Sequence, residues 1–208
     1  MTGEVHVTAV VFDLGNVLVG WDPYLPLADR MTREEWERFA READFGRLNA
    51  MADGGVPVAD LVRRAAEADP SHGELIGRYF DRFGLSLTGP VPGVAEIVDE
   101  LRGLGHRVLG LTNWSAETFH HAPAGAPAIG GLEAVVVSGR EGVCKPSPLI
   151  FQLLVDRHGL DPHRTVFVDD MQPNVDASAA LGFTGIRFVD ANRLRDDLRR
   201  VGVLPGAP

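Results

Sequence analysis

The chain has 208 residues, 45% of them hydrophobic, which is enough to bury one sizeable core and to carry an insertion. Its formal net charge of −9 has the wrong sign for a surface that binds nucleic acid or an anionic membrane, and we expect neither as a partner. The only cysteine, Cys144, excludes a disulfide within the chain, which suits a reducing cytoplasm. Since no apolar stretch approaches the ~20 residues that span a bilayer and no apolar signal core opens the sequence, we expect a cytoplasmic protein.

Strand and helix patterns alternate along most of the chain. Strands are predicted over Val5–Asp13, His106–Thr112, Ala134–Ser138, Thr165–Asp169 and Gly185–Val189. Helices are predicted over Val94–Leu104, Pro148–His158 and Asn174–Leu181, and also from Ser115 and from Asn192 onward. Strands that alternate with helices predict an α/β fold with a parallel sheet and right-handed crossovers.

A block of helical patterns from Pro23 to Gly84 interrupts this alternation after the first strand. It contains two capping-box patterns, Thr32-x-x-Glu35 and Ser71-x-x-Glu74. The segment that follows, Leu85–Gly93, is rich in turn residues and is typical of a linker. We therefore predict a catalytic core formed by residues 1–20 and 88–208, and a small helical cap formed by residues 21–87.

Two of the predicted strands end in aspartate: Val10–Phe12 leads into Asp13, and Thr165–Val168 leads into Asp169-Asp170. Near-continuous apolar runs are typical of strands in parallel sheets, where ligands bind beyond the carboxyl ends. Alternation alone does not fix the strand order, but the doubly wound order 3-2-1-4-5 makes these two strands neighbours, and we predict that order. A single aspartate after a strand is often a turn or cap residue. Adjacent carboxylates instead favour a compensating cation, and oxygen ligands suit Mg²⁺.

Two further segments supply donors for anionic oxygens. Of the 20 basic residues only Lys145 is a lysine, which indicates a site where the wider guanidinium does not fit, although chance is the alternative. The flanking Pro146 and Pro148 place Lys145 in a loop before a helix, where we expect it to neutralise charge beside the aspartates. Thr112-Asn113 ends another strand; alone such a pair is more often a helix cap, but beside the other segments it can bind phosphate.

Four strand ends thus offer, in chain order, Asp13, Thr112 with Asn113, Lys145, and Asp169 with Asp170. This ordered set resembles the haloacid dehalogenase superfamily, mostly phosphatases of Rossmann-like fold that use an aspartate nucleophile and Mg²⁺. The resemblance covers almost the whole chain, and the helical insertion looks like the small helical cap of that superfamily. The branch that contains α-D-glucose-1-phosphate phosphatase is the most similar, as judged from Phe12–Leu18, Trp21-Asp22-Pro23 and Asp170–Val175.

The resemblance implies a Mg²⁺-dependent phosphatase that acts on a small phosphorylated metabolite, with a sugar phosphate as one candidate, through an aspartyl-phosphate. The implied catalytic residues are Asp13, the nucleophile, and Lys145. The implied ligands of Mg²⁺ are Asp13, the backbone carbonyl of Gly15, Asp169 and Asp170. The implied substrate-binding residues are Asn16, Thr112, Asn113 and Lys145.

One position departs from the family pattern. Most members carry a second aspartate, the general acid and base, two residues after the nucleophile, where this chain has Gly15. General acid catalysis is typically worth ~10²–10⁴-fold, so the glycine favours a leaving group that departs unaided or a substitute acid. Asp22 is one candidate substitute, and a simple Asp-Pro turn is the equal alternative. The glycine is also compatible with a 2-haloacid dehalogenase or with a non-catalytic binding protein, but the dehalogenase branch lacks the paired metal aspartates found here.

Overall fold

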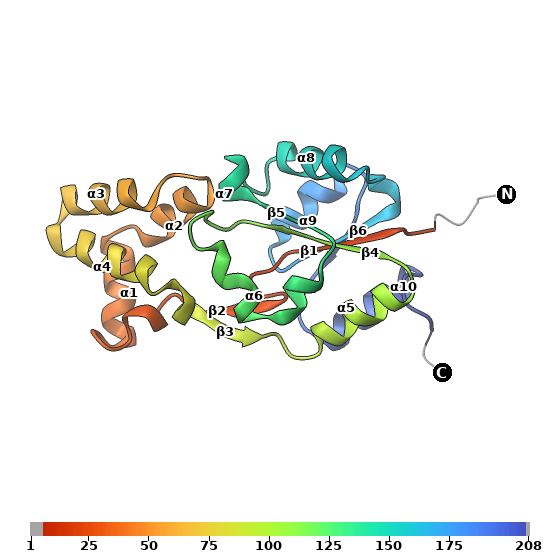
Figure 1. The fold of residues 1–208 in the computed structure, drawn as a ribbon, viewed down its shortest axis with the longest axis horizontal. Coiled ribbons are helices and arrows are strands. Elements are labelled where there is room, and N and C mark those ends of the chain that lie inside the picture. Colours follow the sequence, from red (N-terminus) through yellow and green to blue (C-terminus); the bar gives the residue numbers. More distant parts are fainter. Residues whose placement is uncertain (1–5, 207–208) are drawn as a thin grey trace.

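A computed structural model describes residues 6–206 of the chain. Its core is a parallel sheet in the order β5-β4-β1-β6-β7 (Figure 1), formed by β1 (Ala9–Phe12), β4 (Arg107–Thr112), β5 (Val135–Val137), β6 (Thr165–Asp169) and β7 (Thr184–Arg187). Counted along the chain, these strands stand in the order 3-2-1-4-5, so the predicted order is confirmed. Phe12 of the central strand pairs with Gly110 and with Val168, which places Asp13 level with Asp169.

Helices cover both faces of this sheet (Figure 1). On one face, α5 (Val94–Gly103) and α10 (Ala191–Arg200) bury the side chains of Val10 and Phe12. On the other face, α8 (Pro148–His158) and α9 (Gln172–Ala179) complete a second apolar cluster, in which the ring centroids of Phe151 and Phe167 lie 5.2 Å apart. The central strands are therefore apolar on both faces, as their sequences predict.

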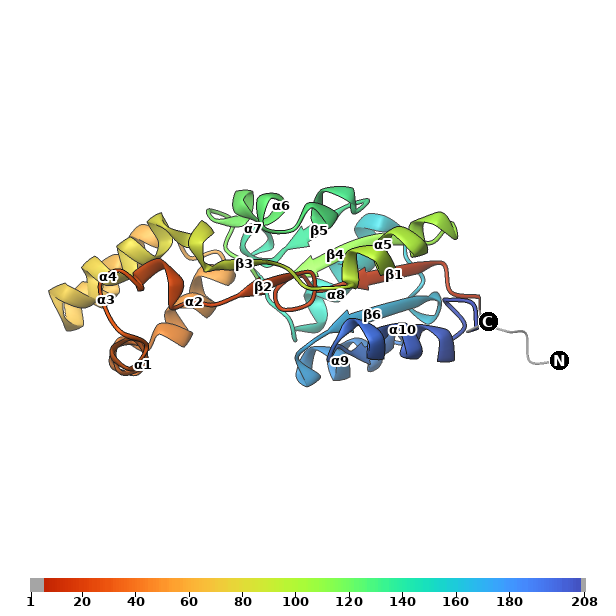
Figure 2. The ribbon, with the colours of Figure 1, turned by 90° about the horizontal axis from the view of Figure 1, so that it is seen from below.

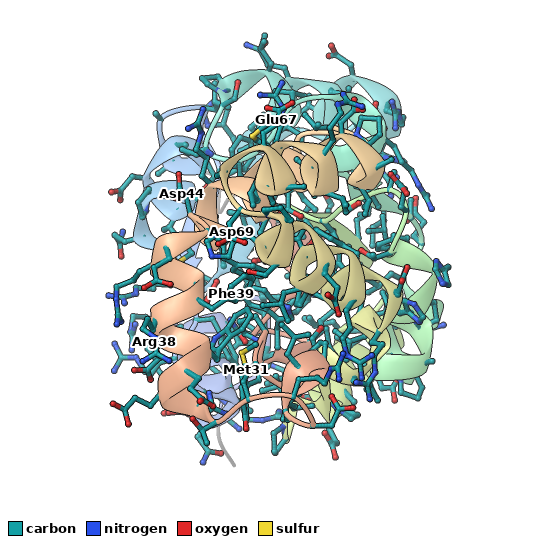
Figure 3. The ribbon with its side chains drawn as sticks, turned by 90° about the vertical axis from the view of Figure 1, so that its left-hand side faces the viewer. Met31, Arg38, Phe39, Asp44, Glu67 and Asp69 are labelled. Atoms are coloured by element: carbon teal, nitrogen blue, oxygen red, sulfur yellow. The ribbon has the colours of Figure 1, made fainter. Side chains whose placement is uncertain are left out.

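Four helices lie together at one end of the molecule, away from the sheet (Figure 2): α1 (Arg33–Glu42), α2 (Phe45–Asp53), α3 (Val58–Ala68) and α4 (Pro70–Asp81). An antiparallel ribbon of β2 (Val19–Trp21) and β3 (Leu87–Pro90) carries the chain to these helices and back. Their interior is aromatic, since the ring of Phe45 lies 4.9 Å from that of Trp36 and 4.8 Å from that of Tyr79. Figure 3 shows Phe39 pointing between α1 and α4, and Arg38 pointing outward. The division of the chain into two domains stays a prediction.

The start of the first predicted strand and the predicted linker need correction. Val5 lies outside the described residues, and β1 begins only at Ala9, because the strands on both sides begin opposite it, at Arg107 and Thr165. The segment Leu85–Gly93 is not only a linker, since it contains β3. Glycine and proline weaken a strand pattern, but a short edge strand of a ribbon tolerates them.

Two helix starts also differ from the prediction. The capping box of Thr32 and Glu35 is present, whereas α4 is capped by Asp69, whose carboxylate accepts from the backbone N–H of Ser71 at 2.8 Å. The chain from Ser115 forms a turn and then a short 3-10 helix, Phe119–His121, rather than an α-helix. The next helix, α6 (Ala122–Gly125), follows later, and the remaining predicted elements are present with slightly shifted ends. No helix within residues 6–206 is long and apolar enough to cross a bilayer.

Candidate active site

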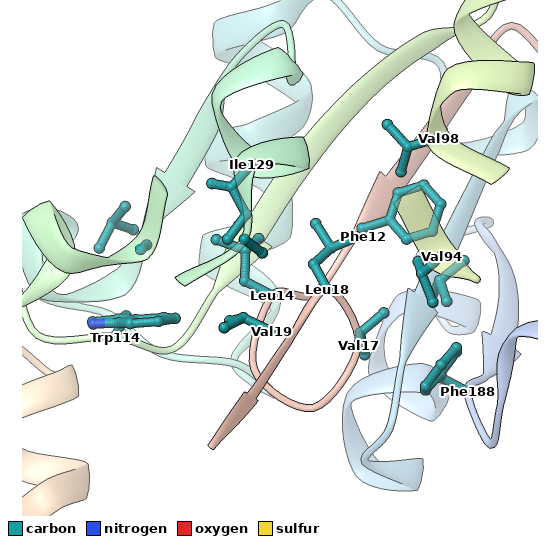
Figure 4. Close-up of a cluster of buried hydrophobic side chains, with 14 of the residues drawn as sticks. Phe12, Leu14, Val17, Leu18, Val19, Val94, Val98, Trp114, Ile129 and Phe188 are labelled. Carbon is teal, nitrogen blue, oxygen red and sulfur yellow. The ribbon is translucent and has the colours of Figure 1, made fainter. Parts of the chain in front are cut away.

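A tight loop after β1 holds Asp13 at the carboxyl edge of the sheet. The backbone N–H of Leu14 donates to Asp13 Oδ1 at 2.7 Å, and that of Asn16 donates to the carbonyl of Val19 at 2.7 Å. Asn16 has a φ of 57°, a left-handed conformation in which asparagine is enriched. The loop is anchored to the core by apolar side chains, shown in Figure 4: Leu14, Val17 and Leu18.

Lys145 connects the aspartates at the two neighbouring strand ends. Its Nζ lies 2.8 Å from Asp13 Oδ1 and 2.7 Å from Asp169 Oδ2, and it donates to the carbonyl of Leu111 at 2.9 Å. The side chain is 1% exposed, so the protein uses all three donors of the ammonium. Burial by itself lowers the pKa of Lys145, but Asp13 and Asp169 outweigh it and raise the pKa above its usual value. The ammonium therefore stays charged between two carboxylates.

Asp169 is fixed by the helix that follows it. Asn174 Nδ2 donates to its two oxygens at 3.0 and 3.1 Å, and the backbone N–H of Met171 donates to Oδ1 at 2.8 Å. Together with Lys145, these donors surround a carboxylate that is fully buried. Asp169 is thus a rigid acidic group on the strand next to Asp13, joined to it through Lys145.

Three carboxylates at this edge can hold one cation. Asp13, Asp169 and Asp170 each offer an oxygen within 4.8 Å of the others. Against the single ammonium of Lys145, they leave two negative charges, which one divalent cation would balance. Burial raises the pKa of Asp13 although Lys145 opposes the shift, and burial followed by repulsion from Asp169 raises that of Asp170. A bound cation would reverse both shifts, and the all-oxygen donor set fits Mg²⁺.

The residues predicted to bind phosphate differ in their access to this site. Asn113 lines the cavity beside Asp13 and also fixes the backbone of Lys145, whose N–H donates to Asn113 Oδ1 at 2.8 Å. Asn16 lines the same cavity, and its Oδ1 accepts from the backbone of Trp21 at 3.2 Å. Thr112 is buried at the end of β4 and is not among the residues that line the cavity.

The cavity beside Asp13 has a volume of about 230 Å³. Its polar lining comes from Asp13, Gly15, Asn16, Asn49, Asp53, Asn113 and Asp170. Its apolar lining comes from Trp21, Phe83, Trp114 and Met171. The cavity therefore joins an acidic end, whose carboxylates can hold a cation, to a wall on which an apolar or ring-shaped group can stack.

The two positions singled out for the missing acid have different surroundings. Gly15 lines the cavity, its φ is not left-handed, and a Cβ on it would meet no atom within 4 Å. Asp22 is absent from the cavity lining, and its Oδ2 lies 2.6 Å from Arg33 Nη2. The hydrogen bond from Arg33 lowers the pKa of Asp22 below its usual value, so this carboxylate stays ionised. The geometry argues against Asp22 as the substitute acid.

Sequence reasoning gave no role to two polar residues of α2 that line the cavity, Asn49 and Asp53. Asn49 Nδ2 donates to Asp53 Oδ2 at 3.1 Å. Burial raises the pKa of Asp53 to about 7. No local pattern marks these residues, because only the packing of α2 on the core brings them near Asp13.

Comparisons with known proteins agree with this geometry. A family model for haloacid dehalogenase-like hydrolases matches residues 7–182. Sesquiterpene phosphatase astK of Aspergillus oryzae is 25% identical over 200 residues, which cover 93% of this chain and 95% of that protein.

Solved structures with the same fold include a magnesium complex and a dehalogenase. The magnesium complex of a HAD family enzyme from Bacteroides thetaiotaomicron has a TM-score of 0.72 at 19% identity, over 93% of this chain and 98% of that one. L-2-haloacid dehalogenase from Xanthobacter autotrophicus, with chloropropionic acid covalently bound, has a TM-score of 0.65 at 19% identity, over 96% of this chain and 85% of that one. At such identities the likeness shows only the fold. The reaction has to be inferred from the residues that form the site.

Proposed function

The chain belongs to the haloacid dehalogenase-like hydrolases, and from that premise we propose that it is a Mg²⁺-dependent phosphatase acting on a small phosphorylated metabolite. The observation that carries the proposal is the excess of acid around Asp13. Asp169 and Asp170 add two carboxylates, and Lys145 balances only one charge. Expulsion of halide does not require this excess of negative charge. Phosphoryl transfer requires a cation beside the phosphoryl group, which the carboxylates can hold. The phosphatase from Aspergillus oryzae and the magnesium complex from Bacteroides thetaiotaomicron support the same choice.

The hydrogen bonds of Asp13 indicate which oxygen attacks phosphorus. Oδ1 accepts from the backbone of Leu14 and faces Lys145 Nζ. Within residues 6–206 no hydrogen bond engages Oδ2, so this oxygen is free to act as the nucleophile. Its attack on phosphorus breaks the ester bond, releases the alcohol and leaves an aspartyl-phosphate, which water then hydrolyses.

The remaining residues hold the phosphoryl group while it transfers. Asn16 and Asn113 line the cavity and can donate from side-chain amides to its oxygens; Asn113 Nδ2 also donates to the carbonyl of Lys145 at 2.9 Å, which leaves one of its two N–H groups for phosphate. All donors of Lys145 are engaged by the protein, so its contribution here is to fix Asp13 and to offset charge. Mg²⁺, held by Asp13, the carbonyl of Gly15, Asp169 and Asp170, would supply neutralisation of the phosphoryl charge.

The cavity restricts the substrate. A volume of about 230 Å³ is small beside the ~300–1,000 Å³ of typical ligand sites, which suits a compact metabolite. Trp21, Phe83 and Trp114 give its wall a stacking surface, which fits a sugar ring or another compact apolar group. Membership of the branch of α-D-glucose-1-phosphate phosphatase stays a prediction.

The test is hydrolysis by the purified protein with added Mg²⁺ or with EDTA. We expect Mg²⁺-dependent release of phosphate from p-nitrophenyl phosphate, and a panel with glucose 1-phosphate and a sesquiterpenyl phosphate then ranks the natural leaving groups. Release of halide from 2-chloropropionate, unaffected by EDTA, would establish the dehalogenase instead. Absence of both activities would favour a binding protein.

A further inference from the structure

The catalytic site at the edge of the sheet needs a proton donor that the nucleophile loop does not provide. Gly15 has no side chain to protonate a leaving oxygen. Among the residues that line the cavity, the only titratable side chains are Asp13, Asp53 and Asp170. Asp13 is the nucleophile and Asp170 belongs to the metal-binding cluster. Asp53 is therefore the one acid in the lining without another assignment.

The backbone of Asp53 is fixed to the core although it lies on a helix of the cap. Its carbonyl accepts from Ser138 Oγ at 2.5 Å, and this hydroxyl accepts from the backbone N–H of Trp114 at 3.0 Å. Ser138 begins α7 (Ser138–Glu141), directly after β5. One hydroxyl thus joins the end of α2 to the loop that follows β4, so Asp53 is held over the cavity.

Close backbone contact strengthens this junction. After α2 the chain turns at Gly55, with a φ of 89°, and a Cβ there would lie 2.9 Å from the carbonyl oxygen of Gly139. A Cβ on Gly139 would itself lie 2.5 Å from the backbone nitrogen of Ala116. Only glycines allow the two backbones to meet this closely. Further along, the backbone N–H of Val58 donates to Glu117 Oε1 at 2.8 Å.

The surroundings of the Asp53 carboxyl allow it to hold a proton. Its hydrogen-bond donors are neutral, the amide of Asn49 and the backbone N–H of Ser115, and it forms no salt bridge within residues 6–206. The titratable groups that act on it are Asp13, Lys145, Cys144 and Tyr79. Burial raises its pKa to about 7, where an acid is present in both forms at neutral pH.

We propose that Asp53, from the cap, is the general acid and base of this enzyme, in place of the aspartate that Gly15 replaces. The inference rests on the proposed phosphatase activity and names a further catalytic residue for it. In the first step Asp13 Oδ2 bonds to phosphorus, the bond from phosphorus to the ester oxygen breaks, and protonated Asp53 gives its proton to that oxygen. In the second step ionised Asp53 takes a proton from the water that attacks the aspartyl-phosphate. Inorganic phosphate leaves, Asp13 is freed and Asp53 is protonated again.

The decisive variant is Asp53→Asn, because the amide keeps the shape and the hydrogen-bond acceptor but cannot transfer a proton. On glycerol phosphate, whose alkoxide leaves poorly, kcat/KM should fall by ~10²–10⁴-fold. On p-nitrophenyl phosphate, whose phenolate leaves unaided, the first step should survive. We then expect a burst of p-nitrophenol equal to the enzyme concentration, followed by slow turnover, because the base for the second step is missing.

Two companion variants control the result. Asp44→Asn, at the exposed start of the same helix, changes an aspartate that does not line the cavity and should match the wild type on both esters. Gly15→Asp, introduced into Asp53→Asn, should restore part of the rate on glycerol phosphate, since the cavity has room for a side chain at residue 15. Thermal unfolding of each variant shows whether the fold is intact.

The outcomes separate this inference from the proposed function. Equal losses on both esters without a burst, or a change in KM alone, would overturn the role of Asp53 and leave the phosphatase standing. Wild-type protein that hydrolyses neither ester in the presence of Mg²⁺ would overturn the phosphatase, and this inference with it.

Discussion

The buried lysine offers the most demanding test of the site's electrostatics. Lys145 is the only basic side chain whose ammonium lies between Asp13 and Asp169, at 2.8 and 2.7 Å, within the described part of the chain. Lys145→Met keeps most of the volume of the side chain and removes the charge. The two carboxylates then face each other and Asp170 with no positive neighbour.

The size of the effect follows from burial. Removing one partner of a buried ion pair typically costs roughly 3–5 kcal/mol, because the remaining charge is left without compensation. Lys145 has two such partners, and its side chain is 1% exposed, so we expect Lys145→Met to lose at least that amount of unfolding free energy. Lys145→Arg keeps the charge, but a planar guanidinium cannot place three donors where Nζ meets Asp13, Asp169 and the carbonyl of Leu111. Displacement of the nucleophile by ~1 Å typically costs ~10²-fold in rate, so the arginine variant should be nearly as inactive as the methionine variant.

Urea denaturation at about pH 8, with EDTA or with Mg²⁺, measures the stability of the wild type and the two variants. The deficit of Lys145→Met should shrink when Mg²⁺ is added, because the cation replaces part of the lost positive charge. A deficit below about 1 kcal/mol without Mg²⁺ would refute the electrostatic role given to Lys145. Near-normal kinetics of Lys145→Arg would show that the single lysine of the chain is an accident.

Four further results are expected. Asp13→Asn should fold normally and lose turnover, because an amide does not attack phosphorus; Mg²⁺-dependent activity above a few per cent of wild type would contradict this. Asp169→Ala should lose both activity and Mg²⁺ affinity, measured by calorimetry, whereas unchanged affinity would remove Asp169 from the ligand set. Gly15→Asp alone should leave the dependence of rate on leaving-group pKa nearly unchanged in a series of phosphate esters, because Asp53 already protonates the leaving oxygen; a clear flattening would show that the wild type lacks a general acid. Because the folded-state pKa of Asp53 is raised to about 7 while the unfolded chain ionises near its usual ~4, stability is lost as the pH rises between these two values, and the loss is complete above about 7. Asp53→Asn should therefore unfold at higher urea than the wild type at about pH 8, by ~1 kcal/mol or more, and show no such gain at about pH 4.

The sheet and its acidic edge were predictable because each depends on a local pattern. Apolar runs that end in Asp13 and in Asp169 predict buried parallel strands, and the strand order that makes them neighbours is confirmed. Lys145 is conspicuous because the other 19 of the 20 lysine and arginine residues are arginines. The structure places it between the two aspartates. The roles assigned to these residues remain predictions.

The features that were missed depend on tertiary packing. β2 and β3 are short, and their glycine and proline residues make them look like turns until they pair with each other. Asn174 reaches Asp169 only because α9 begins directly beyond β6. Asp53 lines the cavity because the end of α2 is hydrogen-bonded to Ser138, and no sequence pattern in α2 predicts this contact. Helix patterns indicate that helices lie between Pro23 and Gly84, but not which of their side chains reach the cavity.

The central claim is that Asp13 carries the phosphoryl group during turnover. It is tested most directly by acid quenching of the enzyme during hydrolysis of p-nitrophenyl phosphate with Mg²⁺, followed by mass spectrometry of its peptides. We predict one phosphoryl group on the peptide that contains Asp13, more of it in Asp53→Asn, and none in Asp13→Asn. Turnover without any phosphorylated peptide, or with the phosphoryl group on another residue, would contradict the account.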